Sequence, residues 1–500
     1  MSNRIKLEEL KAYLWDSAVL LRTHIDAGAY KQYIFPLLFF KRICDVYDEE
    51  CEEILEKYGG DAEALEWEEN HRFNVPRGYH WRDVREVSVD VGVAIVTAFR
   101  KIEKANSEKL QGVFGDGAWT NKYRLPDPLL KNLIEHFSKL TLSITNCPED
   151  ELGQAYEYLI KKFADDSGHT AQEFYTNRTV VHLMTELLQP QSGESIYDPT
   201  CGSAGMLISS IAYLKTQGKE WRNVHLYGQE INALTSAIGR MNLFLHGVKD
   251  FEVVNADTLR HPAFIENGKL KQFDLILANP PYSINQWNRE AFMNDKYGRN
   301  FLGTPPQSRA DYAFFQHILK SLDPKSGRCA ILFPHGVLFR KEEAVLREKL
   351  IKSDLVECVI GLGASLFFNS PMEACIVICR TNKQPKRRGQ ILFINAVNEV
   401  VRKNAQSYLE DMHIEKIANV YHSYKEVEYF SSVNTIADLE KNEYSLNIPL
   451  YVRDTSNIEN GQIYNIKECI IQWHKMRNQL KKKYIELDII MDKLAGERDG

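Results

Sequence analysis

The spacing of hydrophobic positions changes along the chain, and it divides the sequence into regions. Up to about residue 165, apolar side chains recur three and four positions apart, which places them on one face of a helix. The clearest run contains Leu7, Leu10, Tyr13, Leu14 and Ala18. We therefore predict an all-α N-terminal domain over residues 1–165.

A different pattern begins at residue 166 and continues to about residue 400. Short apolar runs of strand length alternate there with stretches of helical spacing. The expected strands are residues 195–197, 224–228, 251–254, 273–278, 329–333, 355–360 and 375–379. Strands that alternate with helices are typical of a parallel sheet covered on both faces. We predict an α/β fold over residues 166–400, with a doubly wound, Rossmann-like sheet.

The end of the chain forms two further regions. Residues 401–464 show no single periodicity, and we expect a mixed connecting region there. Over residues 465–500 apolar side chains again recur at three and four positions, with Lys and Glu between them, which predicts an amphipathic C-terminal helix. Such a helix packs either against the chain's own N-terminal domain or against helices of another subunit. We favour subunit assembly, because the chain already has a core.

The most informative motif follows the apolar run of residues 273–278. It is Asn279-Pro280-Pro281-Tyr282, at the carboxyl end of an expected buried strand. Ligands of open α/β sheets usually bind at that edge. Proline cannot donate a hydrogen bond and has a fixed φ, so the two prolines hold the Pro280 carbonyl outward. An ordinary turn between a strand and a loop is the alternative interpretation.

These four residues suit the activation of a planar amino nitrogen, whose lone pair is delocalised and is therefore a weak nucleophile. The Asn279 side-chain oxygen and the Pro280 carbonyl can accept from its two N–H groups. These bonds favour tetrahedral geometry and free the lone pair for attack on a methyl donor. The ring of Tyr282 offers a face on which a flat base can stack. We predict that Asn279, Pro280, Pro281 and Tyr282 form the catalytic site.

A second candidate site lies upstream, after the strand of residues 195–197. Asp198 is followed by a loop of small residues whose backbone can approach a ligand closely. The small residues are Gly202, Ser203, Ala204 and Gly205. The loop is neither the Gly-x-Gly-x-x-Gly dinucleotide fingerprint nor a phosphate loop, because Gly-Lys-Ser/Thr is absent. An acidic loop that does not bind phosphate suits a nucleotide-type cofactor with an amino-acid tail and no phosphates.

The next two expected strands also end in acids. Glu230 stands at the end of the strand of residues 224–228, where a ribose diol is usually bound. Asp257 follows the strand of residues 251–254 and is placed to accept from an exocyclic amine. Each acid alone can also cap the helix that follows it. Three acids at three successive strand ends, ahead of the strand that leads to Asn279, favour a cofactor site.

Together these motifs resemble those of the S-adenosylmethionine-dependent amino-methyltransferases. Within that class the chain is similar, over nearly its whole length, to the methylation subunit of type I restriction–modification systems, which methylates adenine N6 in DNA. The cofactor and catalytic motifs are matched by Asp198 to Gly205, Glu230, Asp257 and Asn279 to Tyr282. Further similar segments are residues 309–314 and 332–340, and the terminal segments 26–31, 37–42 and 444–449 make the match specific.

The resemblance implies further cofactor-binding residues. The segment Glu173-Phe174-Tyr175-Thr176-Asn177-Arg178 matches the family's segment ahead of the first strand, which wraps around the methionine end of the cofactor. The candidates from this segment are Gln172, Glu173, Phe174, Tyr175, Thr176 and Asn177. Gln172 replaces the usual glycine, and Asn177 replaces the usual proline. The ring of Phe174 or Tyr175 lies either against the sulfonium, as a cation–π contact, or in the core.

The resemblance also implies the reaction. Asn279 favours adenine N6 over cytosine N4, for which serine is usual, and methylation of cytosine C5 needs a thiolate that the motif lacks. A sulfonium methyl is already activated, so alignment of nitrogen, methyl carbon and sulfur is the main requirement, and no metal is expected. One rival interpretation is a protein-glutamine N5-methyltransferase, although these are usually much shorter. The other is a non-catalytic assembly scaffold, which predicts damaged motifs.

The charge balance bears on how such a protein binds double-stranded DNA. The chain has 62 basic and 68 acidic residues, a formal charge of −6 and a pI near 6.2. Duplex binding depends largely on phosphate neutralisation. An acidic chain without a helix-turn-helix or zinc-finger signature therefore needs a partner that recognises the duplex. The resemblance implies a specificity subunit, commonly with two methylation subunits for each, and allows a restriction/translocase subunit.

Compartment and cysteine use follow from the composition. No apolar run approaches the ~20 residues of a membrane helix, and no secretory signal is visible. Nine cysteines lack paired metal spacing. We expect a cytoplasmic protein that does not bind membranes, in which Cys375 and Cys379 pack in the core.

Two polar segments leave alternatives open. Residues 283–307 follow the catalytic motif and contain Gly298 and Gly303. They predict either a mobile loop beside the target base or an ordered surface insertion. Lys383 to Arg388 predict a solvated turn between two strands, with a phosphate contact as the alternative.

Overall fold

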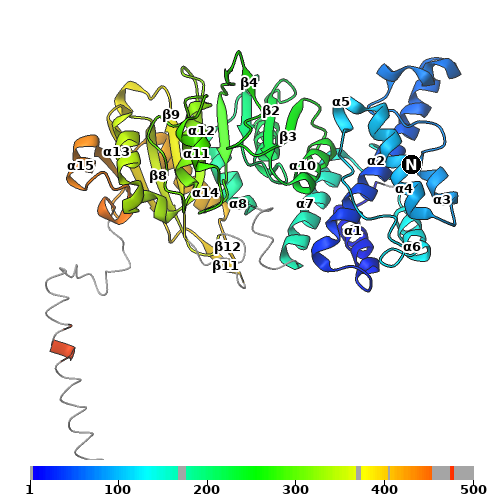
Figure 1. The fold of residues 1–500 in the computed structure, drawn as a ribbon, viewed down its shortest axis with the longest axis horizontal. Coiled ribbons are helices and arrows are strands. Elements are labelled where there is room, and N and C mark those ends of the chain that lie inside the picture. Colours follow the sequence, from blue (N-terminus) through cyan, green and yellow to red (C-terminus); the bar gives the residue numbers. More distant parts are fainter. Residues whose placement is uncertain are drawn as a thin grey trace, which may run out of the picture.

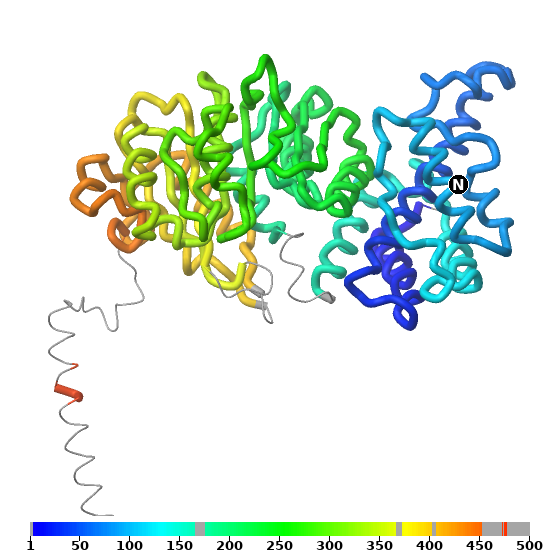
Figure 2. Tube along the Cα trace, in the orientation of Figure 1, coloured from blue at the N-terminus to red at the C-terminus, as the bar shows by residue number. Residues whose placement is uncertain are grey.

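The computed structural model describes residues 4–166, 176–366, 373–403, 406–452, Trp473 and 475–477. A helical region lies at one end of the molecule, and an α/β region forms the rest (Figure 1). The Cα trace shows the N-terminal helices, blue to cyan, beside the green segment of the α/β region (Figure 2). None of the helices among the described residues is long and apolar enough to cross a membrane.

The helical region consists of amphipathic helices that bury their apolar stripes in one core. These helices are α1 (Leu7–Leu21), α2 (Lys31–Lys57), α3 (Trp81–Glu86), α4 (Val91–Ala105), α5 (Ser107–Leu110), α6 (Asp127–Phe137) and α7 (Glu149–Asp166). Aromatic rings fill the centre, and the rings of Phe99 and Phe114 stack with their centroids 4.2 Å apart. The prediction of a helical N-terminal region is confirmed.

The α/β region is built on one sheet of nine strands. The strands are β1 (Ser195–Asp198), β2 (His225–Glu230), β3 (Phe251–Asn255), β6 (Leu275–Ala278), β7 (Arg328–Pro334), β8 (Val356–Leu362), β9 (Ala374–Arg380), β10 (Gln390–Ala396) and β13 (Ser431–Thr435). Their order is β13-β10-β8-β9-β7-β6-β1-β2-β3. Strands β3, β2, β1, β6 and β7 are mutually parallel, so their carboxyl ends meet at one edge. Strand β9 runs antiparallel to both of its neighbours, β7 and β8.

Helices cover both faces of this sheet, as a doubly wound fold requires. They are α8 (Arg178–Leu188), α9 (Gly205–Thr216), α10 (Ala233–Leu245), α12 (Asp311–Lys320), α13 (Ala344–Lys352), α14 (Asp411–Ser423) and α15 (Ile436–Lys441). Side chains of α8, α9 and α14 share a core with Leu275 and Leu277 of β6. Side chains of α12 and α13 share another core with Ile276, which points to the opposite face. This alternation explains why β6 is apolar throughout.

Smaller elements complete the α/β region. Two hairpins join β4 (Ile265–Glu266) to β5 (Lys269–Leu270), and β11 (Val401–Lys403) to β12 (Gln406–Tyr408), and α11 (Arg289–Met293) follows β6. Residues 431–435, from the segment expected to be a mixed connection, pair with β10 at the edge of the sheet. Of the predicted C-terminal helix, Trp473 and residues 475–477 are described and are helical, and the rest lies outside the described residues.

The helical region and the sheet share helix α10. Its residues Ala237, Ile238, Met241 and Leu245 belong to the core of the N-terminal helices, while Leu243 packs in the core of the sheet. Helix α10 lies between β3 and α7 in the ribbon view (Figure 1). The two regions are therefore joined by a common apolar interface as well as by the chain.

Candidate functional site

The predicted site residues converge at the carboxyl edge of the sheet. Asp198 is the last residue of β1, and Glu230 is the last residue of β2. Asn279 directly follows β6, and Asp257 lies two residues beyond β3. Because β1 pairs with both β2 and β6, the acids and the Asn-Pro-Pro-Tyr motif belong to neighbouring strand ends.

The loop after β1 is held by Glu230. Its Oε2 atom accepts from the backbone N–H of Gly202 at 3.1 Å, and its Oε1 atom accepts from that of Asn232 at 2.8 Å. Gly202 and Ala204 both have positive φ, at 52° and 65°, which turns the chain sharply into α9. The carboxylate that was predicted to bind a ribose therefore also fixes the loop predicted to bind the cofactor tail.

Asp198 is 2% exposed, and its Oδ1 atom accepts from the backbone N–H of Thr200 at 3.0 Å. The pKa of Asp198 is raised to about 7, mainly by burial and also by the nearby Glu230 carboxylate, while the Thr200 hydrogen bond acts in the opposite direction. A carboxyl group with this pKa binds a cationic ligand with release of its proton.

Asp257 has a capping role in addition to any binding role. Its Oδ1 atom accepts from the backbone N–H groups of Leu259 and Arg260 at 2.9 and 3.1 Å. Its Oδ2 atom lies 3.8 Å from Arg260 Nε. Oδ1 thus stabilises the turn after β3, as the capping interpretation expected. Oδ2 lies at the distance limit of an ion pair with Arg260.

The catalytic motif forms its own hydrogen bonds in this structure. The Asn279 amide donates through Nδ2 to Thr176 Oγ1 at 3.0 Å, and Asn279 Oδ1 accepts from the Tyr282 hydroxyl at 2.5 Å. Burial raises the pKa of Tyr282 well above its usual range, so the hydroxyl is a neutral donor. Pro280 is buried and Pro281 is exposed. The predicted acceptor oxygen is therefore already bonded to the predicted stacking residue.

A buried ionic network holds the chain directly after the motif. Ser283, at φ 53°, donates its backbone N–H to Asp311 Oδ1 at 2.9 Å. Arg340 donates to Asp311 Oδ2 at 2.6 Å and lies 3.3 Å from Glu343. Burial raises the pKa of Glu343 to about 7. Asp311 and Arg340 lie in segments that resemble the family, but the sequence assigned no role to either residue. Nothing in the sequence links positions 29 residues apart.

Residues 283–307 form an ordered insertion in this structure, as the second of the two interpretations expected. Trp287 and Phe292 pack with Ala310 and Phe314 in a small core of their own. Arg299, which is 3% exposed, donates to the Thr258 and Leu259 carbonyls at 3.0 and 2.9 Å and pairs with Asp295. Arg299 thereby ties the insertion to the loop that contains Asp257.

The segment predicted to wrap the cofactor is described only at its end. Gln172, Glu173, Phe174 and Tyr175 lie outside the described residues. Asn177 Oδ1 caps α8 by accepting from Thr179 N–H at 3.1 Å, and its Nδ2 donates to the carbonyls of Leu366 and Ser407. At this position the asparagine starts the helix by capping it. The proline that is usual in the family would start the helix through its fixed φ.

One residue beside the site was missed by the sequence analysis. Ile231 follows Glu230 directly and is 68% exposed, although it is a large apolar side chain. Its carbonyl is held by Asn255 Nδ2 at 2.9 Å. Its position as an apolar residue directly after a strand-end acid is the signal that could have identified Ile231 as a residue able to pack against a flat ring.

Other candidates serve the fold. Cys375 and Cys379 are buried in β9, and among the described residues no cluster of His, Cys, Asp and Glu could hold a metal. Lys383 is 4% exposed and pairs with Asp354, and Arg387 pairs with buried Glu357 at 3.2 Å. For these two side chains the solvated-turn prediction is wrong, because Arg387 neutralises the buried Glu357 carboxylate, and Lys383 pairs with Asp354 and donates to the Gln390 carbonyl at the start of β10 at 2.9 Å.

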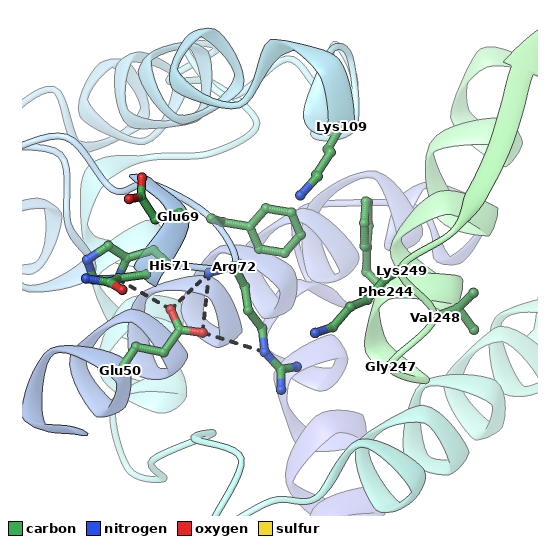
Figure 3. A pocket seen from close by; sticks show the side chains of 11 residues that line it. Glu50, Glu69, His71, Arg72, Lys109, Phe244, Gly247, Val248 and Lys249 are labelled. Atoms are coloured by element: carbon green, nitrogen blue, oxygen red, sulfur yellow. Dashed lines mark hydrogen bonds and ion pairs between the residues drawn. The ribbon is translucent and has the colours of Figure 1, made fainter. Parts of the chain in front are cut away.

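A cavity of about 320 Å³ lies away from this edge, between the helical region and the amino end of β3 (Figure 3). Glu50 lies 3.5 Å from His71 Nδ1 and 3.6 Å from Arg72 Nε on one side, and Phe244 lines the other. Among the polar groups shown there, Glu50 pairs with His71 and Arg72. The cavity is separate from the candidate site.

An open doubly wound sheet with acids at its first strand ends and Asn-Pro-Pro-Tyr after the next defines the class of amino-methyltransferases. Comparison with known proteins gives the family. Residues 148–460 match the family described as N-6 DNA Methylase, and residues 10–137 match the HsdM N-terminal domain.

Relatives and solved structures agree. The type I restriction enzyme MjaVIII methylase subunit of Methanocaldococcus jannaschii is 31% identical over 514 residues, covering 99% of this chain and 86% of that protein. The HindI methylase subunit of Haemophilus influenzae is 30% identical, covering 77% of this chain and 91% of that protein. The crystal structure of the type I restriction-modification system methyltransferase subunit from Streptococcus thermophilus has a TM-score of 0.77 at 30% identity, covering 90% of this chain and all of that one.

The chain belongs to the N-6 DNA methylase family, as a methylase subunit of the type I restriction–modification kind. Its sheet is the Rossmann-like fold of S-adenosylmethionine-dependent methyltransferases, and its activity is DNA adenine N6-methylation. The predicted family, fold and activity are confirmed. The protein-glutamine interpretation is set aside by the same matches.

Proposed function

We propose that this chain transfers the methyl group of S-adenosylmethionine to N6 of an adenine that has been extruded from duplex DNA. The observation behind the proposal is the convergence of Asp198, Glu230 and Asn279 at the ends of neighbouring parallel strands. Bound there, the cofactor supplies a methyl group on a sulfonium that needs no further activation. The role of the protein is then to bind the cofactor and the base, to align them and to exclude water.

The residues at the first three strand ends fit such a cofactor. Asp198 and the loop Gly202–Gly205 would receive the amino-acid tail, because the loop is free of bulky side chains and Asp198 can become anionic beside an ammonium group. Glu230 would accept from the ribose hydroxyls, since a carboxylate has capacity for more than the two N–H groups it already binds. Asp257 would accept from the adenine amine, and Ile231 would cover the ring. Among the described residues at this edge of the sheet there is no phosphate-binding loop, which agrees with a cofactor that carries no phosphates.

The catalytic motif acts on the target amine. Asn279 Oδ1 and the Pro280 carbonyl accept from its two N–H groups, and Tyr282 stacks on the base. In this structure the Tyr282 hydroxyl uses one of the two lone pairs of Asn279 Oδ1, and the other remains for the target amine. Thr176 keeps the amide oriented, because it holds Nδ2 independently. The proton on the methylated nitrogen is then lost to water.

Recognition of the duplex belongs to a partner. The chain carries a formal charge of −6, which opposes unaided binding to phosphates. We propose assembly with a specificity subunit, with two methylation subunits for each, and with a restriction/translocase subunit where DNA is also cleaved. The amphipathic segment 465–500 would form the contact, and the connecting region 401–464 would join it to the methyltransferase domain 166–400 and the helical domain 1–165. The complex would act in the cytoplasm.

The decisive test uses the assembled complex, labelled S-adenosylmethionine and a cognate duplex. Replacing the amide in Asn279→Ala should lower kcat by roughly two to three orders of magnitude, as loss of one positioned polar group does. Asn285→Ala is the matched control, because that exposed asparagine lies outside the motif. Undiminished transfer by Asn279→Ala, or label recovered in protein and not in DNA, would refute the proposal.

A further inference from the structure

The glycine loop of the cofactor site is supported from behind by three polar side chains. We call this group the glycine-loop clamp, and it consists of Glu157 on α7, Arg178 at the start of α8 and Asn242 on α10. Glu157 comes from α7, which packs in the core of the N-terminal helices and also lies within the segment that matches the methylase family. The three side chains therefore connect the two regions of the molecule at the place where the cofactor tail is expected.

Asn242 is the first member of the clamp to touch the loop. It is fully buried, and its Nδ2 donates to the Ser203 carbonyl at 2.9 Å and to Glu157 Oε1 at 2.6 Å. Both neighbours are acceptors, so only the NH2 end of the amide can serve them. The orientation of Asn242 is thereby determined by Glu157 and the loop together.

Arg178 reaches the loop from the other side. Its Nε donates to Glu157 Oε2, and its Nη2 lies 3.5 Å from Ser203 Oγ. A Cβ placed on Gly205 would lie only 1.6 Å from Arg178 Nη1, so the guanidinium occupies the space that a side chain at 205 would need. A side chain at 205 would therefore displace the Arg178 guanidinium from the clamp.

Helix α10 lies directly against the same loop. A Cβ on Gly239 would lie 2.8 Å from the Gly202 carbonyl, which shows how closely the helix approaches. On its far side α10 packs on α7, where the buried Tyr156 hydroxyl donates to the Ile238 carbonyl at 3.3 Å. A shift of α7 therefore moves α10 and the loop with it.

We propose that the helical domain is part of the cofactor site, and that Glu157 acts as a positioning residue that sets cofactor affinity through Arg178 and Asn242. This inference rests on the proposed function, because it assumes that the loop Gly202–Gly205 receives the cofactor tail. Glu157 does not contact the cofactor. It satisfies two donors with one carboxylate, and so it keeps the loop backbone in its binding conformation before the cofactor arrives.

The test compares isosteric variants of the full chain by calorimetric titration with S-adenosylhomocysteine. In Glu157→Gln a single amide oxygen replaces two acceptors, so either Arg178 or Asn242 faces an NH2 group. We expect the dissociation constant, and KM for S-adenosylmethionine in the assembled complex, to rise about tenfold, the scale of one charged hydrogen bond. The kcat at saturating cofactor should change less than about twofold, and Glu157→Asp should restore part of the affinity.

Glu135→Gln is the matched control, since it removes an ion pair to Arg85 of 2.7 Å in the same helical region without contact to the loop. Arg178→Gln is the second variant and should weaken binding to a similar degree even where Glu157→Gln proves unstable. If both folded variants bind S-adenosylhomocysteine as tightly as the wild type, the inference is wrong and the proposed function stands. If the wild type itself does not bind it, the proposed function fails first.

Discussion

Asn279 is bonded at both ends of its amide, to Thr176 and to Tyr282. The first bond orients the amide, and the second uses one of the two lone pairs of the oxygen that the target amine needs. A neutral hydrogen bond in such a place is worth about 1 kcal/mol net, which is small beside the stacking of a base on an aromatic ring, about 1–3 kcal/mol. The tyrosine ring should therefore matter more than its hydroxyl.

This difference is testable at Tyr282. Tyr282→Phe keeps the ring and frees Asn279 Oδ1, so we expect kcat to change by less than about tenfold. Tyr282→Ala removes the stacking face and should lower kcat/KM for DNA by roughly 10- to 100-fold. Steady-state methylation of a cognate duplex measures both. Equal losses in the two variants would show that the hydroxyl, and not the ring, is the essential part.

The raised pKa of Asp198, about 7, gives a pH dependence with a definite sign. In the cofactor-free fold the carboxyl group binds its proton more tightly than in the unfolded chain, so its contribution to stability falls as pH rises from about 4 to 7. A cationic amino group favours the ionised form. Cofactor binding should therefore release protons near neutral pH, and affinity should increase up to about pH 8.

Titration calorimetry in buffers of different ionisation enthalpy measures this proton release. Asp198→Asn cannot ionise, so its affinity should be lower at pH 8 and nearly independent of pH. A wild-type affinity that is flat between pH 6 and 8 would contradict the assignment of Asp198 to the amino-acid tail.

At the scale of elements, the segments after β6 and β7 are joined by Asp311 and Arg340. Asp311 Oδ1 holds the Ser283 N–H and Oδ2 holds Arg340, so one buried carboxylate fixes the exit of the catalytic motif. Asp311→Asn leaves one of these donors unsatisfied. We expect the free energy of unfolding to fall by about 1.5–3 kcal/mol and kcat to fall about tenfold, with cofactor affinity unchanged.

Denaturant unfolding and single-turnover kinetics measure the two effects. Asp116→Asn is the control, because that carboxylate is 96% exposed and pairs only at the surface with Arg100. Loss of stability without loss of kcat would limit Asp311 to a structural role.

The sequence predicted the ends of some strands well, but it did not predict the order of all the strands in the sheet. The strands that lead to Asp198, Glu230 and Asn279 were predicted with carboxyl ends within two residues of those observed, because each apolar stretch is followed directly by a polar turn. The position of β9 between β7 and β8 was not predicted. All three are strands of seven mostly apolar residues that are buried throughout, apart from the half-buried last residue of β9, so local pattern does not rank their neighbours. Packing of helices on both faces decides it.

In the whole molecule the catalytic residues lie at one edge of the sheet, and the negative net charge does not favour binding to DNA. Deletion of the residues after Gly461 should abolish co-purification with a specificity subunit, because it removes the amphipathic segment 465–500. Binding of S-adenosylhomocysteine should persist, since the described edge lies before residue 453. Pull-down with a tagged specificity subunit and calorimetry test the two halves. A truncated chain that still co-purifies would point to packing of this segment on the chain's own helices.

Local pattern and motif spacing alone determined the helical region, the doubly wound sheet and the strand-end residues, because a strand's carboxyl end and its polar successor are adjacent in the chain. Tertiary structure decided what distant residues do to one another. The bond from Asn279 to Thr176, the Asp311–Arg340 pair and the bond from Asn242 to Glu157 join positions separated by 103, 29 and 85 residues. Side chains that far apart meet only when the sheet order and the helix packing bring them together, and no local periodicity encodes that distance.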